Sequence, residues 1–426
     1  MNKLIITRMD GRILTALISG QRALQLNLEE ESGSILGNIY IGKVKNIAKN
    51  INSAFIDLGG GLTAYYSLTE NRRHLFADSL AAGILGNAPG DKPGFKDAKG
   101  QDADRKKTAS GPRLLRPGDE IVVQVKGDAV KTKDPVVTSN ISLTGRYCVL
   151  TLGRCQIGFS SKLSDGPWKE QIRQALLEEK DRDFGIIVRT NAMSASSEEI
   201  LEELKMLRER YYRLLSEAGH RTCHTLLYQA EPSYIGSLRD TYGDFMEEIV
   251  TDQTDIFAGI QEYLKACQPQ DLGRVRFYED PLLSLSKLYS IEKAVDEALQ
   301  KRVWLKSGGY LVIEPTEAMT VIDVNSGKYS GKKTLRDTIL KINLEAAAEI
   351  AFQLRLRNLS GIIVVDFIDM TLPEDRQELM ETFTALCRKD PVKTTVVDMT
   401  ALGLVEVTRK KIRKSFREQV QKGDKR

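Results

Sequence analysis

Short apolar runs separated by turn residues dominate the first third of the chain, and this pattern is typical of β-strands. Residues 3–28 predict a strand, a turn at Asp10-Gly11 and a second strand. Residues 37–68 predict further short strands on both sides of the glycines at 59–61, and another strand follows at 120–125. Closely spaced short strands of this kind indicate a small barrel.

The segment 87–112 interrupts this pattern. It holds almost no large apolar side chains. It therefore cannot bury enough apolar surface to offset the entropy that ordering would cost. We predict that it forms a mobile loop inserted within the barrel.

The middle of the chain predicts a mixture of strands and helix. Apolar runs between residues 147 and 190 indicate further strands. A helix is expected at 198–215, because apolar residues repeat there at helical spacing and either Ser194 or Ser197 can cap its start.

The last part of the chain has the clearest pattern. Strands are predicted at 310–313, 319–324 and 361–367, with a long helix between the last two. One face of that helix carries the apolar residues Leu344, Ala347, Ala348, Ala351 and Leu354. A crossover of this length makes the two strands parallel, and ligands of parallel sheets gather at the carboxyl ends of the strands.

Composition limits the class of protein. A chain of 426 residues is expected to form two or three folding units. Its apolar stretches are far shorter than the ~18 residues of a membrane span and none resembles a signal peptide, so we expect a cytoplasmic protein without a membrane span. The five cysteines form no Cys-x-x-Cys pair, which argues against a disulfide framework or a zinc knuckle.

The net charge of +4 gives only weak support for a polyanionic partner. Cations are concentrated near the carboxyl end, at Arg409, Lys410, Lys411, Arg413, Lys414 and Arg417. This basic tail could lie along RNA, but a solvated helix face explains it equally well.

Two aspartates interrupt apolar strands near their carboxyl ends, Asp323 and Asp366. A charge at such a position is costly unless it is paired or bound to a cation. If the strands are adjacent, both carboxylates can share one magnesium ion, which typically uses one or two carboxylates plus phosphate and water. Asn325 lies on the same strand face as Asp323 and could orient a carboxylate or a phosphate. Strand ends often carry aspartate for turns or caps, so this simpler interpretation stays open.

Other residues also have two interpretations. Phe55 and Tyr65 flank the glycine turn, where they would either stack on bases or fill the barrel core. Arg189 and Thr190 end an apolar strand and suit a terminal phosphate, with a surface salt bridge as the alternative.

Two local patterns resemble a nucleotide-binding loop and a zinc site, but neither meets the requirements of such a site. Residues 327–334 resemble a phosphate loop, but only three residues separate the glycines where four are required, so a nucleotide triphosphatase is not expected. Lys328, Lys332 and Lys333 in that segment could still touch phosphates. His220, Cys223 and His224 lie close together, but no second cluster of potential zinc ligands lies elsewhere in the sequence. We therefore favour a role other than zinc binding for these residues.

Long stretches of the chain resemble the catalytic half of the ribonuclease E/G family. These stretches, together with shorter ones that extend the resemblance over nearly the whole chain, are residues 305–327, 343–351, 353–370, 53–59, 187–191 and 403–409. The resemblance implies an α+β multidomain fold. Its parts would be a ribonuclease-H-like scaffold (1–35 and 233–298), an OB-fold RNA-binding barrel (36–139), a 5′-phosphate sensor (140–232) and a deoxyribonuclease-I-like α/β catalytic subdomain with the basic tail (299–426).

The resemblance also assigns roles to residues. It implies that Asp323 and Asp366 hold a catalytic magnesium ion, for which manganese is an alternative, with Asn325 assisting. The remaining assignments are RNA binding by Phe55, Tyr65 and Lys133, and 5′-phosphate binding by Arg189, Thr190 and Val149.

The implied activity is hydrolysis of single-stranded, A/U-rich RNA to 5′-phosphate and 3′-hydroxyl ends. It would be stimulated by a 5′-monophosphate and would serve ribosomal RNA processing and messenger RNA decay. The Cys-Pro-x-Cys zinc link that often occurs in the family is absent from this sequence, so neither zinc nor a zinc-linked assembly is expected, while a homodimer stays open. The alternative from another class is a non-catalytic RNA-binding factor for ribosome assembly, in which the aspartates serve only the structure.

Overall fold

The computed structural model describes residues 2–31, 34–71, 73–81, 113–127, 134–152, 155–179, 183–240, 246–327 and 335–421. Contacts divide the chain into two compact units. We call Met1–Glu31 with Phe245–Arg426 the host unit, and Ser32–Asp244 the inserted unit. The predicted loop at 87–112, Lys133 and residues 328–334 lie outside the described residues.

The first sheet of the host unit joins both ends of that unit's sequence. Its strands, in spatial order, are β15 (Val275–Phe277), β14 (Met246–Thr251), β1 (Asn2–Met9), β2 (Arg12–Ser19) and β3 (Arg22–Glu30). The expected hairpin at 3–28 was incomplete, because a second turn at Gly20, with φ of 59°, returns the chain as a third strand. Three helices, α5 (Thr254–Cys267), α6 (Leu285–Leu288) and α7 (Ile291–Leu299), belong to the same part of the host unit.

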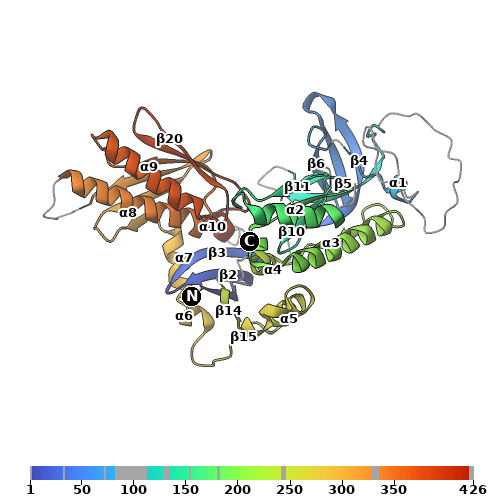
Figure 1. Cartoon of the computed structure of the whole chain (residues 1–426), viewed down its shortest axis with the longest axis horizontal. Helices are drawn as coiled ribbons and strands as arrows, with labels where there is room; N and C mark the ends of the chain where they lie inside the picture. The colour runs from blue at the N-terminus through green and yellow to red at the C-terminus, as the bar shows by residue number, and fades with distance from the viewer. Residues whose placement is uncertain are drawn as a thin grey trace. The chain divides into compact units, whose positions relative to one another are not determined.

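The second sheet of the host unit contains the predicted crossover. In spatial order its strands are β16 (Arg302–Trp304), β17 (Tyr310–Pro315), β18 (Met319–Asn325), β19 (Gly361–Asp366), β21 (Leu404–Arg409) and β20 (Thr394–Met399). Helix α8 (Leu335–Leu356) connects β18 to β19, which are adjacent and parallel as predicted. Helix α9 (Pro373–Arg388) packs beside α8, and α10 (Phe416–Gln421) follows the last strand (Figure 1).

The two faces of this second sheet differ in exposure. One face is buried with α8 and α9 in a core that includes Leu311, Ile313, Ile322, Val324, Ile363, Val365, Val405 and Val407. The predicted apolar face of α8 was partly wrong: Ala347 and Leu354 are buried, but Ala348 is exposed, and Ile342, Ala346 and Ile350 complete the buried face. The opposite face of the sheet, which we call the open face, carries the exposed side chains of Arg302, Trp304, Asp323 and Asp366.

The inserted unit begins with the predicted barrel. Strands β4 (Ile39–Ala48), β5 (Ser53–Gly59), β6 (Leu62–Ser67), β8 (Val136–Thr138) and β7 (Glu120–Gly127) pair in that order, and β7 pairs back to β4 to close an OB-like barrel. Strand β13 (Leu226–Tyr228) adds to β4 from outside. Alternating residues such as Ala54, Ile56, Ala64 and Tyr66 fill the interior. The predicted mixed architecture with a small barrel is confirmed.

The rest of the inserted unit is a small sheet covered by helices. Its strands are β11 (Ile157–Phe159), β12 (Gly185–Val188), β10 (Cys148–Thr151) and β9 (Ser142–Thr144), with helices α2 (Pro167–Glu179), α3 (Ser197–Ala218) and α4 (Ser233–Asp240). Helix α2 was not predicted. The predicted caps of α3 were wrong, because Ser196 is its N-cap: the Ser196 hydroxyl accepts from the Glu199 amide and the Glu199 carboxylate accepts from the Ser196 amide.

Candidate active site

The open face of the second host sheet brings the two predicted aspartates together. Asp323 interrupts the apolar run of β18 near its carboxyl end and Asp366 ends β19, and the two are direct partners in the parallel register. Side chains of register partners share one face, and neighbouring strands lie about 4.8 Å apart. Both side chains are exposed on the open face. The sequence-predicted pair is therefore a real cluster of two carboxylates.

Each aspartate of the pair has a distinct environment. The Asn325 side-chain amide donates a hydrogen bond of 2.7 Å from Nδ2 to Oδ2 of Asp323, as the shared strand face predicted. Partial burial, together with the negative charges of Asp323 and Asp369, raises the pKa of Asp366 above its usual value. Asp369 is a functional candidate that sequence reasoning missed, although its place three residues after Asp366 was a usable signal.

The donor set at this cluster fits a hard cation. Carboxylate oxygens are the ligands that magnesium prefers, and two of them leave room for water and phosphate. Burial is the largest cause of the raised pKa of Asp366, and the charges of Asp323 and Asp369 add to it; a cation bound at the pair would offset that repulsion. The described residues hold no group of three or more histidine, cysteine or acidic side chains able to enclose a metal. Any ion at the pair would therefore depend on water and substrate for its remaining ligands.

A buried asparagine fixes the segment that carries Asp366 and Asp369. Asn343, on α8, is fully buried and donates from Nδ2 to the Ile368 carbonyl at 2.8 Å. Its Oδ1 accepts from the Ile368 amide at 3.1 Å. The Asn343 side chain thereby holds both the amide and the carbonyl of Ile368. This limits how far the neighbouring Asp366 and Asp369 can move.

The barrel aromatics lie outside the barrel core. Phe55 on β5 and Tyr65 on β6 are register partners with ring centroids 6.3 Å apart in an edge-to-face arrangement. Both are half-buried, and they alternate with the fully buried core residues of the same strands. Ser53 donates to the Tyr65 hydroxyl at 2.6 Å, which holds that ring in place. The interpretation of these rings as core packing is therefore wrong.

The predicted phosphate-binding residues form a second cluster, in which Arg189 already has an anionic partner. Its guanidinium donates from Nη2 to Oδ1 of Asp240 at 2.8 Å and from Nη1 to the Gly145 carbonyl at 2.6 Å. Thr190 contacts Ser160 through their hydroxyl groups at 3.2 Å. Val149 is half-buried on β10, the strand beside β12. The alternative of a salt bridge is thus present, but its partner lies on α4 and was not foreseen.

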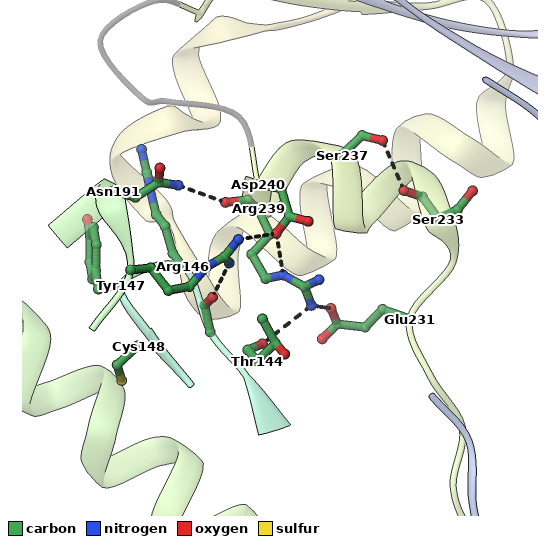
Figure 2. A network of polar contacts seen from close by, with 12 residues as sticks. Thr144, Arg146, Tyr147, Cys148, Asn191, Glu231, Ser233, Ser237, Arg239 and Asp240 are labelled. Atoms are coloured by element: carbon green, nitrogen blue, oxygen red, sulfur yellow. Dashed lines mark hydrogen bonds and ion pairs between the residues drawn. The ribbon is translucent and has the colours of Figure 1, made fainter. Parts of the chain in front are cut away.

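Figure 2 shows how the carboxylate of Asp240 is shared. Arg239 also donates to Oδ1 of Asp240, from Nε at 3.1 Å, and it contacts Glu231 at 3.4 Å. Asn191 donates to the Arg239 carbonyl at 3.2 Å, which ties the segment after Arg189 to the end of α4. Burial raises the pKa of Asp240, but Arg189 and Arg239 outweigh it and hold the pKa below its ordinary value.

A glutamate on α3 shapes the turn that supports Arg189. The carboxylate of Glu203 accepts hydrogen bonds from three consecutive backbone amides, those of Arg146, Tyr147 and Cys148. A side chain at Gly145 would collide with that carboxylate, since an added Cβ would lie 2.4 Å from its carbon. The Gly145 carbonyl is therefore presented to Arg189 in a fixed position, and sequence reasoning had no signal for this contact.

A further prediction concerns the cations near the carboxyl end of the chain. The prediction that the cations of the basic tail all lie on the surface was partly wrong. Arg409 is buried, and its guanidinium pairs with the Asp390 carboxylate at 2.7 Å. Lys410, Lys411 and Arg417 are exposed.

No helix in the described part of the chain has the length and apolarity needed to cross a membrane.

Comparisons with known proteins agree with the resemblance seen in the motifs. Residues 142–412 match the model of the ribonuclease E/G family. The chain is 35% identical over 383 residues to ribonuclease E of Nostoc sp., an alignment that covers 88% of this chain and 51% of that protein. It is 30% identical over 417 residues to ribonuclease G of Escherichia coli K12, covering 97% and 81%. With ribonuclease G of Haemophilus influenzae it shares 33% identity over 406 residues, covering 94% and 78%.

The chain thus spans about half the length of the Nostoc protein and most of the length of the two ribonuclease G proteins. The barrel, the paired carboxylates and these matches define the class of protein as an endoribonuclease. More particularly, the chain belongs to the ribonuclease E/G family.

Proposed function

We propose that the chain is a magnesium-dependent endoribonuclease that hydrolyses single-stranded, A/U-rich RNA to 5′-phosphate and 3′-hydroxyl ends. The observation that carries the proposal is the direct register pairing of Asp323 with Asp366 on the open face. Asp323 and Asp366 would hold the ion, with manganese as an alternative. When bound, magnesium supplies Lewis-acid polarisation of a phosphodiester and stabilises the negative charge of the transition state.

The side chains of the site have separate tasks in this proposal. Asn325 fixes Asp323 through its hydrogen bond, so that one carboxylate keeps its orientation before substrate arrives. Asp369 adds negative charge beside Asp366 and so strengthens the attraction for a cation. Asn343 holds the backbone between these two acidic residues. Water is the nucleophile, which gives linear product ends rather than a cyclic 2′,3′-phosphate.

The inserted unit would bind the rest of the substrate. Phe55 and Tyr65, half-buried on neighbouring strands of the barrel, would stack on unpaired bases, which favours single-stranded RNA. Arg189 and Thr190, with Val149 beside them, would receive a 5′-monophosphate, and the guanidinium would exchange Asp240 for the phosphate. Lys133 remains a predicted RNA contact outside the described residues.

The sheets support a proposal for the parts of the chain. The five-stranded sheet of the host unit would be the ribonuclease-H-like scaffold, from residues 1–35 and 233–298. The six-stranded sheet with α8 and α9 would be the deoxyribonuclease-I-like catalytic subdomain, residues 299–426. The barrel (36–139) and the small sheet (140–232) lie in the sequence between the two segments of that scaffold. Processing of ribosomal RNA and decay of messenger RNA are the proposed tasks.

The test uses one A/U-rich oligonucleotide in two forms, with a 5′-monophosphate or a 5′-triphosphate. Wild type should cut both in magnesium, should cut the monophosphorylated form faster, and should be inactive after chelation of the metal. The newly formed ends should accept direct ligation at the 5′-phosphate. A cyclic 2′,3′-phosphate on the products, or undiminished cleavage by Asp323→Asn, would remove the proposal.

A further inference from the structure

Three side chains in one row cross the open face beside the paired carboxylates. Trp304 on β16 is the register partner of Tyr310 on β17, and Tyr310 is in turn the register partner of Asn325 on β18. Register partners in adjacent strands project from the same face of a sheet. The aromatic pair therefore shares its face with Asn325 and, two residues earlier on β18, with Asp323.

The two rings lie side by side at an angle, and a neighbouring guanidinium lies over both. The ring centroids of Trp304 and Tyr310 are 5.2 Å apart, with an angle of 58° between the planes. The guanidinium carbon of Arg302 lies 4.5 Å from the Tyr310 centroid and 5.8 Å from the Trp304 centroid. We call Arg302, Trp304 and Tyr310 the aromatic platform. Within the platform Tyr310 is half-buried, whereas Arg302 and Trp304 are exposed.

The exposure of the platform is not explained by the stability of the fold. Trp304 is 64% exposed, although tryptophan is on average among the most buried residues. It lies on the edge strand of the sheet, and the core on the other face is filled by other side chains. Arg302 contacts both rings, whereas the nearby carboxylate of Glu314 pairs with Lys301. An exposed large ring with an adjacent cation is suited to a ligand rather than to packing.

The spacing relates the platform to the proposed reaction centre. Two strand spacings separate Trp304 from Asn325, which is about 10 Å across the sheet. A base stacked on Trp304 would therefore belong to a nucleotide close to the phosphodiester held near Asp323 and Asp366. A polyanionic chain crossing this face would also meet the positive charge of Arg302, which a neutral apolar partner would not need.

We propose that the aromatic platform binds a nucleobase of the single-stranded RNA next to the scissile phosphodiester. This inference rests on the proposed function, because the ligand is the substrate of that site. It adds a base-binding subsite in the host unit that is separate from Phe55 and Tyr65 of the inserted unit. Stacking on an aromatic ring tolerates any base, so the platform orients the strand and does not select a sequence.

The first test observes Trp304 directly. The chain contains two tryptophans, so Trp168→Phe leaves Trp304 as the sole tryptophan fluorophore. In the presence of a chelator, to prevent cleavage, an A/U-rich single-stranded oligonucleotide should quench this emission saturably. An abasic oligonucleotide of the same length should not, because it offers the phosphates without the bases. Equal quenching by both, or no quenching by either, would overturn the proposal.

The second test separates binding from chemistry. Trp304→Ala should raise KM for single-stranded RNA about tenfold, which is in the range measured for loss of one stacked base, with kcat unchanged. Trp304→Phe keeps a ring and should restore most of the affinity. Leu282→Ala is the matched control, since Leu282 is also an exposed large apolar residue of the host unit but lies outside the sheet, and its KM should equal that of wild type.

The outcomes distinguish the platform from the proposed activity. If wild type does not cleave RNA, but an oligonucleotide with bases quenches Trp304 and an abasic one does not, the platform is supported and the hydrolytic proposal is rejected. If wild type cleaves RNA and Trp304→Ala has an unchanged KM, only the platform is rejected. If Trp304→Ala abolishes self-association and leaves RNA binding intact, the ring belongs to an interface between copies and the proposal is overturned.

Discussion

Asp323 and Asp366 stand directly opposite each other on adjacent parallel strands, with a complete helix between them in the sequence. Replacing either by asparagine preserves shape and removes one of the two charges that would hold a cation. We expect kcat to fall on the order of 10³-fold for each variant, since charge stabilisation in the transition state is lost. Cleavage assays at saturating RNA measure this. Glu406→Gln is the control, because Glu406 is an exposed acidic residue on β21 of the same sheet, and it should leave kcat unchanged.

The aspartate pair could be predicted because the sequence signals there are local. An aspartate interrupts each apolar run of strand length near its carboxyl end, and the length of the crossover between the two runs dictates parallel strands. Asn325 followed from the two-residue period of a strand. The one long-range feature that the sequence left open was whether β18 and β19 are adjacent, and the structure shows that they are.

Contacts between distant elements could not be predicted. Asp240 and Glu203 reach the Arg189 region from helices far along the chain, and nothing in their own sequence marks them. The register that places Trp304 beside Tyr310 is likewise a property of strand pairing. Arg409 shows the converse error: a residue in a basic run is buried, because Asp390 from another element neutralises it.

Because Asp240 holds Arg189, it competes with any phosphate for the same guanidinium. Asp240→Asn should therefore lower KM for 5′-monophosphorylated RNA severalfold and leave 5′-hydroxyl RNA unaffected. Arg189→Ala should abolish the difference between the two substrates. Glu231→Gln is a control, since Glu231 contacts Arg239 and Arg210 rather than Arg189. A higher KM for monophosphorylated RNA in Asp240→Asn would instead give Asp240 a positioning role.

The same carboxylate should make stability depend on pH. Arg189 and Arg239 hold the pKa of folded Asp240 below the value near 4 of an unfolded chain, against the opposing effect of burial. Its stabilising contribution is therefore fully present above the unfolded pKa and is lost as pH falls through the folded pKa. The difference in unfolding free energy between wild type and Asp240→Asn, from urea denaturation, should be larger at pH 7 than at pH 3. A difference independent of pH would show that the ion pair adds nothing to stability.

The position of the α3 cap can be tested with two adjacent serines. Ser196→Ala removes the hydroxyl that accepts from the Glu199 amide and should cost about 1 kcal/mol of stability. Ser197→Ala changes the first helical residue instead and should have almost no effect. Denaturant unfolding and hydrogen exchange of the Glu199 amide measure both variants. Equal effects of the two substitutions would contradict the assigned cap.

Asn343 should influence catalysis without reaching the substrate, because its two hydrogen bonds hold Ile368 between Asp366 and Asp369. Asn343→Ala leaves two backbone groups without their partner, and we expect it to lower the unfolding free energy by about 2 kcal/mol. It should also lower kcat, since the acidic segment loses its anchor. Ile350→Val is the matched control, because Ile350 is buried on the same helix and its truncation costs about 1 kcal/mol while leaving Ile368 untouched. If both variants lose stability but only Asn343→Ala loses kcat, Asn343 positions the acidic segment. If kcat is unchanged in Asn343→Ala, Asn343 has a structural role only.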